Sequence, residues 1–157
     1  MNTLIITKDD IDSEGFYKAH SLDFDGDVEI TENLGVVKFK GFIRASLSIN
    51  AKAGSGIDAG RGIEAGSGID AGRGIKAVWG IKAGSGINAG WGIEAGSGIE
   101  AGSGIDAGLS IYAKYILCGL RIFAGTSIYK IPSDSEMMIF GEIRKGVIAF
   151  GLAGEMK

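Results

Sequence analysis

Residues 53–110 read AGSGIDAGRGIEAGSGIDAGRGIKAVWGIKAGSGINAGWGIEAGSGIEAGSGIDAGLS, in which a six-residue unit, A-G-x-G-I-x, recurs without a break. Its isoleucines stand at every sixth position, namely Ile57, Ile63, Ile69, Ile75, Ile81, Ile87, Ile93, Ile99 and Ile105. A unit this short cannot fold alone, so its isoleucine is buried only when neighbouring units stack on one another. The repeat therefore predicts a solenoid, a rod in which each coil stacks on the coil before it.

The residue that follows each repeat isoleucine indicates how many units make one coil. If the isoleucine points inward, this residue points to solvent, because alternate residues of a strand lie on opposite faces. Twelve residues per coil would stack Asp58 on Asp70, and like charges directly opposite each other repel. Eighteen residues per coil produce outward columns that alternate in sign or are separated by a neutral amide: Asp58/Lys76/Glu94, Glu64/Lys82/Glu100 and Asp70/Asn88/Asp106. The charges therefore predict a three-sided coil of eighteen residues.

The residue between the two glycines of each unit supports the same geometry. In a coil of eighteen residues, Trp79 stacks on Arg61, and Trp91 stacks on Arg73. An arginine over a tryptophan ring makes a cation–π contact worth roughly 0.5–1 kcal/mol at an exposed site. Both tryptophans therefore find a partner in a three-sided coil.

These patterns predict an all-β fold, a three-sided parallel β-helix with coils about 4.8 Å apart. We expect the solenoid of hexapeptide repeats to span residues 42–131, because the I-x-A signature continues on both sides of the regular block with small phase shifts. Residues 1–41 alternate like strands and are expected to form irregular N-terminal strands or a cap. Residues 132–157 are expected to form a loop and a C-terminal β-hairpin cap, since the open ends of a solenoid need covering. The whole chain is expected to be one folded unit.

Three-sided coils of eighteen residues with an aliphatic residue at every sixth position resemble the left-handed hexapeptide β-helix, best known from acyltransferases. The resemblance covers roughly residues 43–131 and implies a left-handed coil. That family places a small residue four positions after the aliphatic one, whereas here the small residue is the alanine two positions after it. Its catalysis also needs a histidine base in a cleft between coils, and the single histidine, His20, lies outside the repeats. The resemblance therefore implies the architecture without the activity.

Runs of G-I-x-A-G are also similar to small proteins of phages and mobile elements, among which anti-CRISPR inhibitors of host defence are found. This resemblance implies a protein of the bacterial host cytoplasm, and its partner would be a host protein or a ribonucleoprotein complex. The resemblance assigns no site residues.

Composition and charge narrow the classes of function. A net charge of −3 over 157 residues leaves no basic footprint, so no direct contact with nucleic acid is expected. The N-terminal stretch is too short and too acidic for a signal peptide, and Lys114 and Arg121 interrupt the most apolar stretch, so no membrane partner is expected. The single Cys118 allows no internal disulfide and is expected to fill an interior alanine position.

Candidate catalytic and metal-binding motifs are weak. The string GSGIDAG could suggest a phosphate loop, but it recurs along the chain and lacks both a following helix and a Lys-Ser/Thr pair. With His20 as the sole imidazole, no Ser/His/Asp or Cys/His set is available. Asp23, Asp25, Asp27 and Glu29 share the solvated face of a strand, or alternatively bind calcium weakly. We expect no catalytic residues, no cofactor and no metal.

The coil that starts at Ile75 differs from its neighbours, because it carries large side chains where other coils have serine or glycine. Tryptophan together with arginine is the composition most enriched at interface hot spots. The candidate binding patch comprises Trp79, Trp91, Arg61, Arg73, Lys76 and Lys82. The alternative is that each tryptophan lies flat on its arginine and only shields a corner.

A second surface lies at the outward positions of the last coil, where apolar residues replace the charges of earlier coils: Tyr112, Leu117, Phe123 and Tyr129. A contiguous apolar strip of this kind is rarely left in contact with water. Either the hairpin after Pro132 folds back on the strip, or a second chain covers it and the protein is a homodimer.

Two classes of function follow. The first is a non-catalytic protein-binding solenoid, an inhibitor that docks on a host defence or nucleic-acid-processing complex. The second is a self-associating structural scaffold. Two remote alternatives are an ice-binding protein, although the regular block holds no threonine, and an inactive relative of the hexapeptide acyltransferases.

Overall fold

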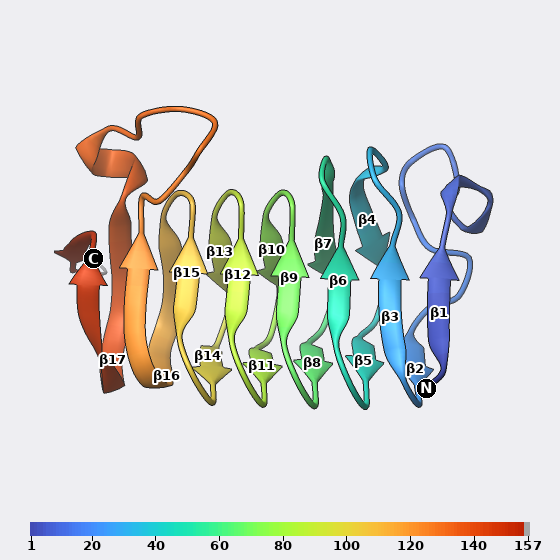
Figure 1. Cartoon of the computed structure of the whole chain (residues 1–157), viewed down its shortest axis with the longest axis horizontal. Coiled ribbons are helices and arrows are strands. Elements are labelled where there is room, and N and C mark those ends of the chain that lie inside the picture. The colour runs from blue at the N-terminus through green and yellow to red at the C-terminus, as the bar shows by residue number, and fades with distance from the viewer. Residues whose placement is uncertain (156–157) are drawn as a thin grey trace.

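The computed structural model describes residues 1–155, which form a rod built mostly from short strands (Figure 1). In the regular block each repeat forms one strand over its I-x-A residues, and the chain turns a corner at the residues that follow. The β-branched isoleucine suits an extended backbone, and glycine permits a tight corner. The strands of this block are β7 (Ser55–Ala59), β8 (Ile63–Ala65), β9 (Ile69–Ala71), β10 (Ile75–Ala77), β11 (Ile81–Ala83), β12 (Ile87–Ala89), β13 (Ile93–Ala95), β14 (Gly98–Ala101) and β15 (Ile105–Ala107).

Every third strand stacks on the same side of the rod. The first face contains β7, β10 and β13, the second face contains β8, β11 and β14, and the third face contains β9, β12 and β15. On the first face Ile57 pairs with Ile75, and Ile75 pairs with Ile93, so parallel partners are eighteen residues apart. The three-sided coil of eighteen residues is therefore confirmed, and with it the three predicted charge columns.

The core consists of stacked isoleucines with the repeat alanines beside them. Every repeat isoleucine from Ile57 to Ile105 is at most 1% exposed, and the alanine two positions later is also buried. Cys118 pairs in register with Ala101 and is fully buried, which confirms its predicted place in an alanine position. Burial raises the pKa of the Cys118 thiol, because the charged thiolate is poorly solvated there.

The coil begins near the N-terminus. Its strands there are β1 (Thr3–Ile6), β2 (Leu22–Phe24), β3 (Asp27–Ile30), β4 (Gly35–Phe39), β5 (Ile43–Ala45) and β6 (Ile49–Ala51), with the short 3-10 helix η1 (Lys8–Asp10) after β1. β4 stacks parallel on β7 with partners twenty residues apart, whereas β2 and β3 stack on β5 and β6 with partners twenty-one residues apart. Tyr17 packs against Phe39, with ring centroids 5.2 Å apart, and helps to close this end of the core.

The C-terminal part comprises β16 (Ile111–Ala124), the 3-10 helix η2 (Asp134–Glu136), β17 (Met138–Phe150) and β18 (Leu152–Gly154). β16 bends around all three faces, since it pairs in turn with β13, β14 and β15. β17 lies parallel on β16, and β18 lies parallel on the start of β17. The predicted C-terminal cap of strands is present, but its strands are parallel, unlike those of a simple antiparallel hairpin. Gly141, Gly146 and Gly151 have positive φ angles and turn the chain at successive corners, so the segment completes a last coil.

Figure 1 shows a right-handed coil. The third-face strands run upward on the side nearest the viewer, the first-face strands run downward behind them, and the chain advances from right to left. The left-handed coil implied by the hexapeptide resemblance is therefore not found. A right-handed path agrees with the general preference for right-handed connections between parallel strands.

Candidate binding grooves

Corner residues of successive coils stack in columns, and each tryptophan lies one coil beyond its arginine. The Trp79 amide donates to the Arg61 carbonyl at 3.0 Å, and the Trp91 amide donates to the Arg73 carbonyl at 3.4 Å. The Arg61 guanidinium lies 5.4 Å from the centroid of the Trp79 ring, and the Arg73 guanidinium lies 5.1 Å from that of Trp91. Both predicted cation–π contacts are present.

These contacts leave much of each tryptophan ring uncovered. Trp79 is 58% exposed and Trp91 is 46% exposed. Ser97 follows Trp79 in the same corner column and turns the chain without a large side chain. The tryptophans therefore add little to the core, and each leaves an exposed aromatic surface on the outside of the rod.

The structure divides the six candidate patch residues between two edges of the rod. Trp79 and its arginine stand at the edge between the first and second faces, whereas Trp91 and its arginine stand at the edge between the third and first faces. Lys76 projects from the first face and Lys82 from the second. The tryptophans are twelve residues apart, which is two thirds of a coil, so they cannot share an edge. The patch expected from the sequence is two separate surfaces.

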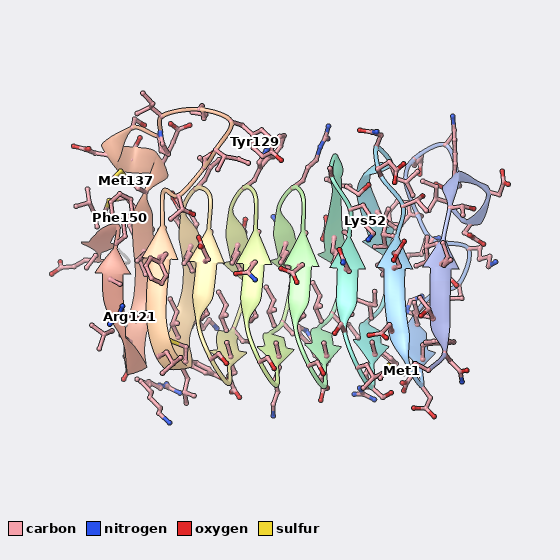
Figure 2. The ribbon with its side chains drawn as sticks, viewed as in Figure 1. Met1, Lys52, Arg121, Tyr129, Met137 and Phe150 are labelled. Atoms are coloured by element: carbon pink, nitrogen blue, oxygen red, sulfur yellow. The ribbon has the colours of Figure 1, made fainter. Side chains whose placement is uncertain are left out.

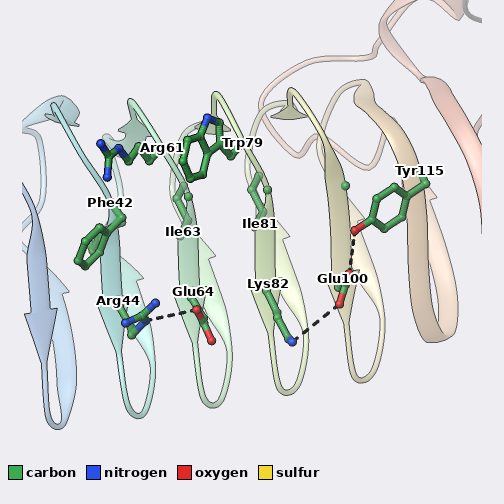
Figure 3. Close-up of a pocket in the computed structure, with 14 residues that line it drawn as sticks. Phe42, Arg44, Arg61, Ile63, Glu64, Trp79, Ile81, Lys82, Glu100 and Tyr115 are labelled. Atoms are coloured by element: carbon green, nitrogen blue, oxygen red, sulfur yellow. Dashed lines mark hydrogen bonds and ion pairs between the residues drawn. The ribbon is translucent and has the colours of Figure 1, made fainter.

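A groove of about 350 Å³ runs along the second face beside Trp79, and we call it the Trp79 groove (Figure 3). It exists because three successive coils carry glycine immediately before the second-face isoleucine, at positions 62, 80 and 98. Phe42 and Tyr115 occupy the equivalent position in the flanking coils and close the two ends. One wall is formed by Arg61 and Trp79, and the other by the outward charges Arg44, Glu64, Lys82 and Glu100.

The charged wall of the Trp79 groove is a ladder of ion pairs. Arg44 lies 3.3 Å from Glu64, and Lys82 lies 4.0 Å from Glu100. The Tyr115 hydroxyl donates a hydrogen bond of 2.8 Å to Glu100. This bond raises the pKa of Tyr115, because the neutral phenol is the form that can donate. The wall therefore presents both signs of charge at fixed positions one coil apart.

A second groove, of about 480 Å³, lies on the first face beside Trp91, and we call it the Trp91 groove. Lys76 lines it and lies 3.3 Å from Glu94. Leu109 and Tyr112 make its C-terminal part more apolar than the Trp79 groove. Each tryptophan thus has its own groove, with one of the two candidate lysines in its wall.

The four apolar residues expected to form a strip are spread around the rod. Tyr112 lies on the first face, Leu117 on the second and Phe123 on the third, because β16 bends around all three faces. Tyr129 lies in the loop between β16 and η2 (Figure 2). The last coil stacks on the three strip residues that lie in β16. The Tyr112 ring stacks on the Phe140 ring with centroids 4.6 Å apart, and Leu117 and Phe123 pair in register with residues 145 and 150.

The N-terminal acidic residues contact separate partners on the next coil. Asp23 lies 3.3 Å from Arg44, and Glu29 lies 3.5 Å from Lys52. Asp25 accepts a hydrogen bond from the Ser46 hydroxyl and Asp27 accepts one from the Ser48 amide, at 2.8 and 2.9 Å. Within residues 1–155 no group of three or more His, Cys, Asp or Glu side chains converges as a metal site would require.

His20 lies outside both grooves, where its carbonyl accepts a hydrogen bond of 2.7 Å from the Gly41 amide. In the described part of the chain, neither 3-10 helix approaches the length and apolar character needed to cross a bilayer, and no other helix is present.

Comparisons of the chain with protein-family models, with curated proteins and with solved structures gave no match.

Proposed function

We propose that this chain is a non-catalytic protein-binding rod that docks on its partner through the Trp79 groove. The observation that supports this most directly is the exposed Trp79 ring above Arg61. The next coil has a serine, Ser97, at the same corner position, so the corner itself does not need a tryptophan. Tryptophan and arginine dominate interface hot spots, because each combines a large contact area with a directional polar group. A groove with such an anchor and a floor of glycine suits an inserted side chain or loop.

The charges of the Trp79 groove favour a protein partner over a nucleic acid. A polyanion in the groove would meet the carboxylates Glu64 and Glu100 as well as three cations, Arg44, Arg61 and Lys82. Within residues 1–155 no carboxylate pairs with Arg61, so its guanidinium is free to bind a carboxylate or a carbonyl of the partner.

The partner that we propose is a host protein or a ribonucleoprotein complex of bacterial defence, which the rod would inhibit in the cytoplasm. The support is a rigid surface with a groove beside an exposed tryptophan. The resemblance of the G-I-x-A-G runs to small phage and mobile-element proteins stays an expectation from the sequence, since no curated protein matches the chain. Expression of the chain in a host with active CRISPR immunity should restore plating of a targeted phage. Unchanged plating across the CRISPR types tested would contradict this choice of partner.

The docking site is tested with two matched single variants. The wild-type chain captures its partner from the native host, and the purified partner is then titrated against Trp79→Ser and Trp91→Ser. We expect Trp79→Ser to weaken binding by roughly 2 kcal/mol or more, as hot-spot truncations do. Trp91→Ser should bind like the wild type, and circular dichroism should be unchanged for both. Loss confined to Trp91→Ser would move the interface to the Trp91 groove.

A self-associating scaffold is the second candidate, and the apolar residues of the last coil favour it. Light scattering of the purified chain separates the two candidates. A defined small species agrees with a binder, whereas polymers that grow with concentration agree with a scaffold.

A further inference from the structure

Within residues 1–155 the C-terminal end of the rod presents an unpaired strand edge on each of its three faces: β18 on the first face, and the later part of β17 on the second and third. On the first face, β18 stacks on the start of β17. On the second and third faces, residues 142–145 and 147–150 pair with β16 on one side only, and no strand of residues 1–155 lies on their other side. The backbone groups along these three edges are therefore available to another chain.

The hydrophobic core reaches this open end. Ile143 and Ile148 continue the core columns by pairing with Ile116 and Ile122, yet both are only half-buried because nothing lies beyond them. On the outside of the third face, Val147 is 66% exposed and Phe150 is 49% exposed. At the N-terminal end Ile6, Tyr17 and Leu22 are buried, and Leu4 and Ile11 are half-buried against the core.

We propose that the C-terminal coil binds the C-terminal coil of a second copy of this chain, as a two-fold symmetric dimer. A coil advances by about 4.8 Å along the rod axis in each turn, so the rod does not end at the same height on its three faces. It reaches furthest on the first face, where β18 lies. A two-fold axis through the third face exchanges the first and second faces. It places β18 of each copy on the open second face of the other.

The same axis brings the two open third-face edges together. Because each face is one third of a turn above the last, all three junctions can be one strand spacing wide at once. A flat partner surface or a single added strand could pair with the edge on one face only. The edges on the other two faces, which end at different heights, would stay unpaired. The end of the rod is thus complementary in shape to another copy of itself.

Side chains agree with this axis. The second-face edge carries Glu142, Arg144 and Lys145, whereas residues 147–150, on the axis, carry no charge. Antiparallel pairing about the axis sets Val147 of one copy beside Phe150 of the other, twice. An aromatic residue beside a β-branched one is a favourable cross-strand pair. The dimer does not depend on the proposed partner of the Trp79 groove, and it would present two such grooves on one longer rod.

The test is the mass of the full chain by size-exclusion chromatography with light scattering at micromolar concentration. We expect twice the chain mass for the wild type, and the single-chain mass for Val147→Lys and for Phe150→Glu. Mixing these two variants should restore a dimer, because the introduced lysine then meets the introduced glutamate across one junction. Val78→Lys is the matched control, since Val78 is also exposed but lies in the middle of the rod, and it should remain a dimer.

Cross-linking provides a measurement that does not depend on the charged variants. Ala149→Cys places a thiol near the axis, and a short thiol-specific cross-linker should join two copies of it. Ser85→Cys, on a corner of the middle coils, should not cross-link. A monomeric wild type, polymers that grow with concentration, or a dimer that persists in both charged variants would each overturn the proposal, as would equal cross-linking at both cysteines.

Discussion

The two glycines of each repeat meet different neighbours. From Gly60 on, a Cβ atom at the first glycine would collide with a carbonyl oxygen of the preceding coil; at Gly84 that oxygen belongs to Gly66. At the second glycine, contact is ordinary in several coils; a Cβ atom at Gly86 would lie 3.5 Å from the Gly104 carbonyl oxygen. Neither Gly84 nor Gly86 has a positive φ angle, so backbone conformation does not require glycine at either position. The first position requires glycine because the backbones of neighbouring coils come too close there for a Cβ atom.

Alanine substitutions should therefore separate the two glycines. We expect Gly84→Ala to lower the free energy of unfolding by about 1–3 kcal/mol, as overpacking does. Gly86→Ala should be neutral, or stabilising by about 0.4–1 kcal/mol, because it restricts the unfolded chain. Val78 occupies a first-glycine position, so the backbone can shift there and Gly84→Ala should still fold. Urea denaturation measures both variants, and equal effects would contradict the steric argument.

The buried thiol provides a second test at the scale of one residue. Cys118 is fully buried and its pKa is raised, so both access and thiolate population are low. We expect an aromatic disulfide reagent at pH 8 to react with Cys118 much more slowly in the folded protein than in denaturant. A fast reaction without unfolding would place Cys118 outside the core.

Among the elements, the charge column of the first face links β7, β10 and β13. Lys76 stacks between Asp58 and Glu94 and lies 3.3 Å from Glu94. Lys76→Glu would place three carboxylates in a row, and we expect a loss of less than about 1 kcal/mol because the site is exposed. Adding Glu94→Lys should recover part of the loss, and high salt should shrink it. A loss that salt does not change would point to packing instead of charge.

The outward charges predicted three sides because a wrong coil length would stack like charges, as Asp58 on Asp70. The same columns arise in a coil of either hand, so the charges carry no information on handedness. The alternating residues 138–150 likewise suit an antiparallel hairpin or a parallel coil. The strand pairing decides between them, because β17 runs parallel to β16 and β18 runs parallel to β17. Positive φ angles at Gly141 and Gly146 suit a hairpin turn as well as a corner of the coil, so these glycines do not disclose the choice in the sequence.

At the scale of the whole molecule, the candidate site depends on coils of unequal length. The cation–π pair of Trp79 follows from the regular period and was predicted. Phe42 and Tyr115 come into register with Gly62 and Gly98 through coils of twenty and seventeen residues. Those lengths depend on where insertions fall in irregular corners, so the ends of the Trp79 groove were not predicted. The sequence does carry one signal for the ends of the groove: Phe42 and Tyr115 each stand immediately before an isoleucine, where the regular repeats have glycine.

A rod held together by contacts between neighbouring coils should be most stable in its middle. Ile81 is buried between Ile63 and Ile99, whereas Ile148 stacks on Ile122 alone and is half-buried. We expect Ile81→Ala to cost about 2–5 kcal/mol of unfolding free energy, as for other core truncations. Ile148→Ala should cost less in dilute protein, because its side chain buries less area.

The difference in stability between the middle and the C-terminal end of the rod should depend on protein concentration if the proposed dimer forms. A second copy would cover Ile148 and leave the surroundings of Ile81 unchanged, so only the cost of Ile148→Ala should rise with concentration. Amide hydrogen exchange should report the same trend, with slow exchange in β9 to β12 at any concentration and exchange in β17 that slows as the dimer forms. Equal costs for both variants in dilute protein would mean that the last coil is as well packed as the middle, in which case the end of the rod offers no open core for a second copy to cover.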